Sequence, residues 1–167
     1  MHNRDIRRVE SPDEIRAVAA LAREIWNQHF VPIIGQAQVD YMLQTIQSVE
    51  AITEQMEKGY EYWLLHVDDE DAGYFALIPD AAAGSAMLSK FYLLESRRGC
   101  GHGTAMLAFI EKRCRELGMR DLWLTVNRHN AEPIAVYKHM GFKVTGTIVK
   151  DIGEGFVMDD YRMAKPV

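Results

Sequence analysis

The spacing of hydrophobic positions predicts a helical first third of the chain. Ser11 and Glu14 mark a helix start, because serine caps the first turn, the proline between them fits the first helical position, and a carboxylate three residues after the cap completes a capping box. Apolar residues then recur at helical spacing to about His29. Two more helices are predicted over residues 38–46 and 49–58.

The period changes at about residue 60, where aromatic and aliphatic residues suited to strands dominate. Acidic residues followed by glycine over 68–73 predict a turn. The remaining expected elements are a strand over 6–9 before the first helix, strands over 60–67, 73–79 and 86–94, a helix over 103–117, a strand over 121–126, a helix over 133–140, and strands over 143–150 and 156–164. This order, β-α-α-α-β-β-β-α-β-α-β-β, predicts an α/β (α+β) fold: a mixed, mostly antiparallel, twisted sheet of about seven strands with helices on both faces.

The composition fits one soluble domain over residues 1–167. With 48% hydrophobic and 26% charged residues, a chain of this length buries a core without cross-links. The net charge of −5 argues against a general nucleic-acid binder. No apolar run is long enough for a membrane helix, the N-terminus lacks a secretory pattern, and Cys100 and Cys114 lie too far apart along one helix for a disulfide. We therefore expect a cytoplasmic protein without nucleic-acid or membrane partners.

The segment between the strand at 86–94 and the helix at 103–117 carries the clearest chemistry. It reads Arg97-Arg98-Gly99-Cys100-Gly101-His102-Gly103-Thr104. Glycines at alternate positions permit positive φ angles and a close approach of a ligand, so successive N–H groups form an anion-binding nest at a helix N-terminus. Two arginines add positive charge. The loop is therefore predicted to hold a pyrophosphate.

Other interpretations of the same loop fit less well. A dinucleotide-binding loop needs glycine or alanine at Thr104 and a first parallel strand before the loop, and a P-loop needs a Gly-Lys-Ser/Thr sequence. The glycines alone would also fit a tight strand-to-helix turn that binds nothing. Cys100 is a poor candidate for a nucleophile, and the position of His102 suits phosphate contact or solvent better than a catalytic base.

A second group of residues follows the strand at 121–126. Asn130 comes shortly after that strand, and the next helix presents Tyr137 one turn before a Gly-Phe pair. Arg98-x-x-Gly101-x-Gly103 resembles the acyl-CoA signature of the GNAT acetyltransferases, and Asn130…Tyr137-x-x-x-Gly141-Phe142 resembles the second signature of that superfamily. The spacing of the two motifs and the order of elements are also similar, over nearly the whole chain.

The resemblance implies a role for each matching residue. Acetyl-CoA would be the cosubstrate, no metal would be needed, and Tyr137 would protonate the departing thiolate. Asn130 would hydrogen-bond the pantetheine arm, and the backbone at Leu93 would pair with the pantetheine and acetyl group. The pyrophosphate would be held by the backbone of Arg98, Gly99, Cys100, Gly101, His102, Gly103 and Thr104.

The acceptor side is less determined. The residues that would line an apolar or cation-binding cleft, or that would simply be core aromatics, are Trp26, Phe30, Tyr41 and Tyr92, with His29 beside them. Candidates for a general base are Glu24, Glu61, Glu95 and Asp159, or a water chain with no side-chain base.

These observations predict an N-acetyltransferase that moves acetyl from acetyl-CoA to a primary amine by direct attack in a ternary complex. A polyamine is the first candidate, because residues 151–161 resemble the ending of polyamine-type GNAT enzymes; amino acids, antibiotics and peptide N-termini stay open. The alternative is a non-catalytic acyl-CoA-binding sensor or regulatory module. A homodimer is implied by the resemblance alone.

Overall fold

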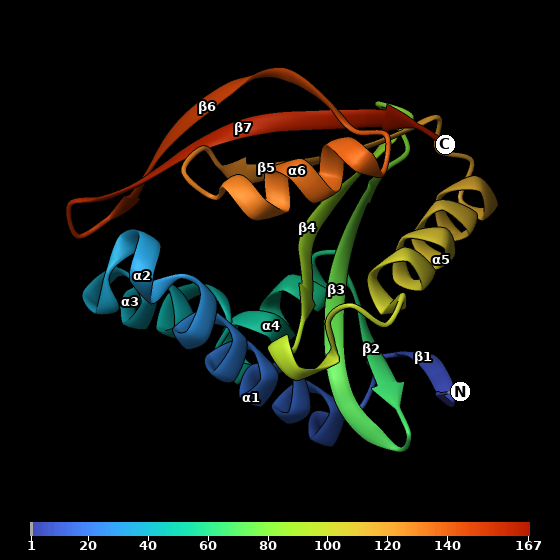
Figure 1. Cartoon of the computed structure of the whole chain (residues 1–167), viewed down its shortest axis with the longest axis horizontal. Helices are drawn as coiled ribbons and strands as arrows, with labels where there is room; N and C mark the ends of the chain where they lie inside the picture. The colour runs from blue at the N-terminus through green and yellow to red at the C-terminus, as the bar shows by residue number, and fades with distance from the viewer. Residues whose placement is uncertain (1) are drawn as a thin grey trace. The chain divides into compact units, whose positions relative to one another are not determined.

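The computed structural model of this chain describes residues 2–167 (Figure 1). The chain divides into two compact units. The first unit takes the residues up to Ile78 together with Lys90–Leu107, and the second takes Pro79–Ser89 and Ala108–Val167. Each unit is described below by itself.

The strands are β1 (Arg4–Arg8), β2 (Glu61–Val67), β3 (Glu70–Asp80), β4 (Ser85–Leu93), β5 (Asp121–Asn127), β6 (Lys143–Gly153) and β7 (Phe156–Pro166). The helices are α1 (Pro12–His29), α2 (Val31–Ile34), α3 (Gln36–Ile46), α4 (Val49–Glu57), the 3-10 helix η1 (Glu95–Arg97), α5 (His102–Glu116) and α6 (Ala131–His139). The strand order is β1-β2-β3-β4-β5-β7-β6. β4 and β5 are parallel, whereas β1–β2, β2–β3, β5–β7 and β6–β7 are antiparallel. The mixed, mostly antiparallel sheet of seven strands predicted from the sequence is confirmed.

In the first unit, α1 begins at a complete capping box. The Ser11 hydroxyl accepts a hydrogen bond from the Glu14 N–H at 3.2 Å, and the Glu14 carboxylate accepts one from the Ser11 N–H at 2.9 Å. These bonds satisfy N–H groups that a helix start otherwise leaves open. The apolar face of α1 is buried through Ile15, Val18, Leu21, Ala22, Ile25 and Trp26.

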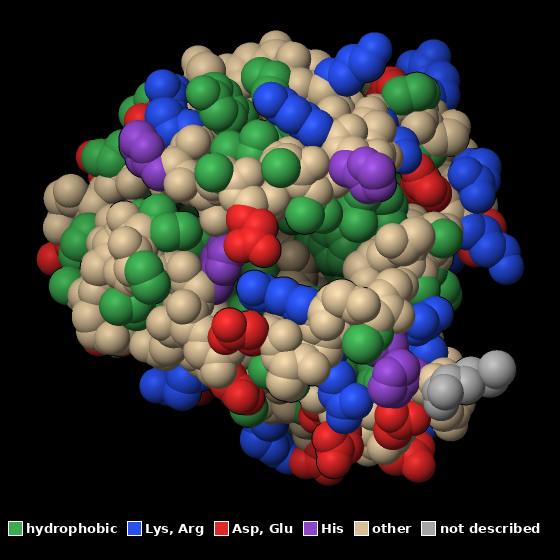
Figure 2. Space-filling model, in the orientation of Figure 1, with side chains coloured by type: hydrophobic (Ala, Val, Ile, Leu, Met, Phe, Trp, Pro, Cys, Tyr) green, Lys and Arg blue, Asp and Glu red, His purple; other side chains and the backbone are tan. Residues whose placement is uncertain are grey.

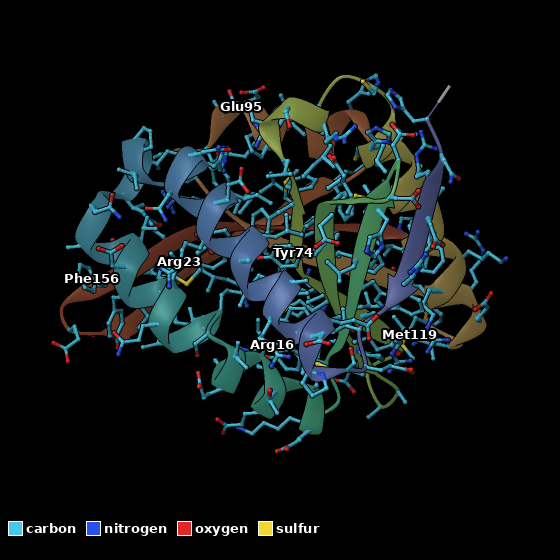
Figure 3. The ribbon with its side chains drawn as sticks, turned by 90° about the horizontal axis from the view of Figure 1, so that it is seen from below. Arg16, Arg23, Tyr74, Glu95, Met119 and Phe156 are labelled. Atoms are coloured by element: carbon cyan, nitrogen blue, oxygen red, sulfur yellow. The ribbon has the colours of Figure 1, made fainter. Side chains whose placement is uncertain are left out.

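A buried polar network joins the helical part of this unit to β2 and β3. The Gln47 amide donates to the Tyr62 hydroxyl at 2.9 Å and accepts from the Tyr74 hydroxyl at 2.6 Å, while Tyr62 donates to Gln55 at 2.6 Å. Tyr74, labelled in Figure 3, and Tyr62 are both fully buried. Burial raises the pKa of both phenols, so each stays a neutral donor. The network therefore buries no charge, and folding avoids the free-energy cost of taking a charge out of water.

The turn between β2 and β3 is tighter than the sequence suggests. Asp68 and Asp69 both have positive φ, 53° and 65°, so two residues make the turn. The expected contribution of Gly73 to this turn is wrong, because Gly73 lies inside β3. A Cβ atom at Gly73 would lie 2.5 Å from the Tyr92 carbonyl oxygen and 3.2 Å from the Leu93 side chain. Glycine is needed there for a close approach of β4.

In the second unit, β7 lies between β5 and β6, and Figure 1 shows β6 and β7 as one long hairpin. The Lys165 ammonium donates to the Met140 carbonyl at 2.8 Å and pairs with Glu111 at 2.5 Å. These two contacts tie the C-terminal end of α6 and the middle of α5 to β7. Asp159 and Asp160 lie on an inner strand, because β5 and β6 pair with the two sides of β7.

Two short helices differ from the prediction. The helix α2 was not predicted, and Pro32 lies in its first turn, where a missing N–H costs nothing. η1 follows β4 directly and shortens the loop that precedes α5. The other predicted elements agree with the structure to within a few residues at each end. Both cysteines are free thiols, as expected.

Candidate functional site

The glycine loop of the first unit starts α5. Gly99 and Gly101 have φ of +81° and +79°, and open space surrounds the position of a Cβ atom at each. The first N–H of the helix to find an intrahelical partner is that of Ala105, which donates to the Gly101 carbonyl at 3.1 Å. The N–H groups of residues 102–104 precede it and lie in the first turn, where the helix offers no acceptor. The loop thus has the open donors and the helix dipole that an anion requires.

Two details of the loop differ from the expectation. Only two of the three glycines have positive φ, since Gly103 lies in the first turn of α5. Arg97 is less available than expected, because its guanidinium lies 2.9 Å from Glu70 and 3.8 Å from Asp68 on the β2–β3 hairpin. Arg98 is exposed and is the arginine left to face a ligand of the loop.

His102 is buried, with 1% of its surface exposed. Arg4 of β1 donates from Nε to the His102 Nδ1 at 3.0 Å, and the ring of His2 lies edge-on at 5.3 Å. Burial first, and then the nearby Arg4 guanidinium, lower the pKa of His102, so its imidazole is neutral at pH 7. An imidazole in this setting is unsuited to act as a solvent-exposed catalytic base.

The end of β4 brings Leu93 next to β3. The Leu94 N–H donates to the Ala72 carbonyl at 2.8 Å, and Gly73 allows the close approach described above. Leu93 is half-buried and is the last residue of β4. The helix η1, which leads into the glycine loop, begins two residues later. The strand β3 therefore holds the backbone of Leu93 in place, and Leu93 lies only a few residues before the glycine loop in the sequence.

Three of the aromatic residues predicted for the acceptor side lie together. Trp26, Phe30 and Tyr92 form one cluster, with ring centroids 5.5, 5.7 and 5.9 Å apart in edge contacts. Tyr74 joins it at 5.6 Å from Tyr92. Trp26 is buried, but Phe30 and Tyr92 keep part of their surface exposed. Tyr41 lies half-buried on α3.

The candidate bases of the first unit are in different environments. Glu24 is exposed on α1, and Glu95 projects from η1, where it is labelled in Figure 3. Glu61 is buried, and its carboxylate lies 3.9 Å from the Arg8 guanidinium and accepts from the Trp63 indole at 3.2 Å. These partners favour a structural role for Glu61.

The second predicted motif lies in the second unit. Asn130 is buried at the N-cap of α6, where its carbonyl accepts from the Ile134 N–H at 3.2 Å. The ring of Tyr137 meets that of buried Phe142 edge-on at 5.7 Å, and Gly141 between helix and strand has φ of +99°. Burial raises the pKa of the Tyr137 phenol. The phenol therefore keeps its proton at neutral pH, as a general acid must.

Asp160 is a buried carboxyl that sequence reasoning did not single out as a candidate base. It pairs with Asn127 across β5 and β7, and it is 5% exposed. Burial raises its pKa; the Thr125 hydroxyl bond acts against this and the neighbouring Asp159 adds to it. Asp159 instead lies 2.8 Å from the Arg128 guanidinium, which also covers the Tyr161 ring. The alternation of side chains along β7 explains why adjacent aspartates differ.

Charge on the surface does not contradict the predicted absence of nucleic-acid binding. On the face shown in Figure 2, basic and acidic side chains are interspersed instead of gathered by sign. None of the helices in residues 2–167 combines the length and apolar character that a membrane span requires.

Comparison with known proteins assigns the family. The sequence model described as the acetyltransferase (GNAT) family matches residues 19–142, which is more than half of the chain. The chain therefore belongs to the GNAT acetyltransferase family.

Its relatives agree with this assignment. The uncharacterized N-acetyltransferase YjgM of Escherichia coli K12 is 28% identical over 89 residues, which are 52% of this chain and 53% of that protein. The uncharacterized N-acetyltransferase YycN of Bacillus subtilis 168 is 27% identical over 110 residues, 61% of this chain and 70% of that protein. The chain thus aligns with about half the length of YjgM.

Among solved structures, the PaiA N-acetyltransferase of Thermoplasma acidophilum in complex with coenzyme A has the same fold. The TM-score is 0.81 with 21% sequence identity, and the alignment covers 99% of each chain. The likeness extends from the first strand to the last, as the sequence resemblance implied.

Proposed function

We propose that the chain is an acetyl-CoA-dependent N-acetyltransferase that acetylates a primary amine of a small molecule. The observation that carries the proposal is the glycine loop at the head of α5, with two positive-φ glycines and the open N–H groups of residues 102–104. Such a loop binds an anion, and because the chain belongs to the GNAT family we infer that this anion is the pyrophosphate of an acyl-CoA. In this role the backbone of residues 98–104 holds the donor.

The remaining residues of the predicted site supply the chemistry. The acceptor nitrogen attacks the thioester carbon, a C–N bond forms, the C–S bond breaks, and the electron pair of that bond leaves with sulfur. Tyr137 donates its phenolic proton to the sulfur. Because the pKa of the phenol is raised, the phenol still carries this proton at neutral pH. Asn130 and the Leu93 backbone position the pantetheine arm. The acceptor ammonium loses its proton before attack, to a side-chain base or a water chain.

The acceptor is proposed to be polyamine-like. The partly exposed rings of Phe30 and Tyr92 are suited to an alkyl chain or a cation, and the net charge of −5 attracts a polycation. The cytoplasmic location and the homodimer stay predictions that accompany this function. A sensor that binds acyl-CoA without turnover is the rival, and the half-buried Tyr137, whose raised pKa keeps the phenol neutral, favours the enzyme because a sensor needs no acid.

Tyr137→Phe tests the proposal. Removing the hydroxyl should lower kcat by about 10²- to 10⁴-fold, the usual contribution of a general acid, and leave the acetyl-CoA Kd within about threefold. Thiol release measures kcat and calorimetry measures Kd. Tyr60→Phe, which removes a hydroxyl outside the proposed site, should change neither. An unchanged kcat in Tyr137→Phe removes the acid role from this residue.

A further inference from the structure

The first unit contains a group of metal-ligating side chains that acetyl transfer does not use. His2, Cys100 and His102 each offer one ligand atom, and these three atoms lie within 4.8 Å of one another. The residues come from the segment before β1 and from the glycine loop, about a hundred positions apart in sequence. We propose that His2, Cys100 and His102 form a binding site for a divalent transition-metal ion of the zinc type.

His2 is already arranged as a metal ligand. Its Nδ1 lies 2.9 Å from the Asp68 carboxylate, which also accepts the Asn3 N–H at 3.0 Å. Because an ionised carboxylate only accepts, the His2 Nδ1 carries the proton and the lone pair is on Nε2. A carboxylate that orients a histidine through its distal nitrogen is the usual outer support of a zinc ligand. Asp68 therefore fixes the tautomer that the metal needs.

His102 supplies the observation that points to a ligand. Its Nδ1 accepts from Arg4, whereas its Nε2 is buried without a hydrogen-bond partner among the described residues. Such an atom costs about 1–3 kcal/mol unless something satisfies it. Because Nδ1 accepts the Arg4 N–H, Nε2 carries the ring proton in this arrangement and is a donor without an acceptor. A metal ion on Nε2 displaces that proton and replaces the missing hydrogen bond with a coordinate bond.

The ligand types select the metal. Two imidazoles and one thiolate are borderline-to-soft donors, which suit zinc, cobalt(II) or copper and disfavour magnesium and calcium. On a tetrahedral zinc ion, N and S ligands lie about 3.3–3.6 Å apart. The present limit of 4.8 Å leaves about 1 Å to close. Cys100 is exposed and stands between two positive-φ glycines, and an added Cβ at either glycine would meet no other atom.

Arg4 opposes metal binding, so replacing it should have the opposite effect on metal affinity from replacing a metal ligand. A metal on His102 Nε2 moves the ring proton to Nδ1, where the Arg4 Nε–H now points. Arg4 must give up that bond, and its positive charge also repels the ion. Removing Arg4 is therefore expected to strengthen metal binding, whereas removing a residue that merely held the histidine in place would weaken it.

The experiment uses the full chain with its own N-terminus and no added histidine tag, reduced and free of acetyl-CoA. Titration with Co²⁺ should give thiolate-to-cobalt charge-transfer absorption with tetrahedral d–d bands, at one ion per chain. Zn²⁺ should then displace the cobalt, and competition with a chromophoric chelator gives its Kd. Cys100→Ser and His102→Gln should each weaken Zn²⁺ by more than about 100-fold, and Asp68→Asn by about 10-fold. Arg4→Met should tighten it by at least about threefold.

Two control variants each remove a cysteine thiol or a histidine imidazole outside the proposed metal site. Cys114→Ser and His129→Ala, on the second unit, should leave the Zn²⁺ Kd within about twofold. Circular dichroism checks that every variant is folded; since Cys100 is exposed, its replacement leaves the fold intact. Cobalt spectra without a charge-transfer band, or the same Kd in Cys100→Ser as in the original chain, would overturn the proposal. The site does not depend on the proposed acetyl transfer, so failure of one leaves the other standing.

Discussion

At the scale of single residues, the sequence motifs predicted candidate site residues but not the residues that contact them. Tyr137 and Asn130 were predicted from their spacing, and the structure adds that one is a half-buried phenol with a raised pKa and the other a buried N-cap. The contact between Arg4 and His102 spans 98 positions, and local patterns carry no information on such pairs. Asp160 was missed for a similar reason, because its burial follows from the position of β6, which the sequence order alone does not give.

Asp160 also gives a stability prediction with a definite sign. Its folded pKa is raised by burial, so as pH rises the unfolded carboxyl ionises first and the free energy of unfolding falls. The loss begins at the unfolded pKa and is complete above the folded pKa. Asp160→Asn keeps an acceptor for Thr125 but never ionises, so the variant should gain stability relative to the original chain between pH 3 and pH 7.

Urea unfolding at a series of pH values measures this difference. Asp121→Asn, at an exposed position at the start of β5, is the matched control and should show no such trend. A stability difference for Asp160→Asn that stays constant with pH, or that falls as pH rises, would show that the carboxyl is not held in an unfavourable environment.

At the scale of elements, local sequence signals predicted where helices and strands begin and end better than they predicted which strands pair. The capping box of Ser11 and Glu14 predicted the start of α1 to the residue, because its hydrogen bonds are made within one turn. The β2–β3 turn was misplaced, because Asp68 and Asp69 at positive φ are as compatible with a two-residue turn as with a longer one. Strand order was outside the reach of the sequence, because it is set by contacts between distant segments.

The cap of α1 has a measurable contribution. Ser11→Ala removes the acceptor of the Glu14 N–H and should lower the free energy of unfolding by about 1 kcal/mol. Ser96→Ala, an exposed serine of η1, serves as the control and should cost less than about 0.5 kcal/mol. Equal effects of the two substitutions in urea unfolding would mean that the capping bond contributes nothing.

The backbone of the glycine loop is tested by Gly101→Ala. The position is open, so the added Cβ meets nothing, and the cost comes from φ of +79° alone, about 1–2 kcal/mol. If this conformation is needed to hold the pyrophosphate, the acetyl-CoA Kd should rise roughly 5- to 30-fold. Gly118→Ala, at φ of +76° and equally open, carries the same strain outside the loop and should leave Kd unchanged. Equal Kd values for both variants would dissociate the loop from acetyl-CoA.

At the scale of the whole molecule, the order of elements and the two motifs carry the family assignment. Residues 19–142 match the family model, and the fold agrees with a coenzyme A-bound acetyltransferase over 99% of both chains. The acceptor is not encoded as clearly. The glycine loop and Tyr137 lie in motifs that resemble the signatures of the family, whereas no such motif marks the aromatic cluster of Trp26, Phe30 and Tyr92, which we propose for the acceptor.

The measurement that tests the account most directly is turnover. The purified chain is incubated with acetyl-CoA and a panel of polyamines, amino acids, aminoglycosides and peptides with free N-termini, while thiol release and acceptor mass are followed together. We predict thiol release in proportion to acetylated product, highest with a polyamine and absent without an amine. Tight acetyl-CoA binding with no thiol release across the panel would contradict the account and favour a sensor.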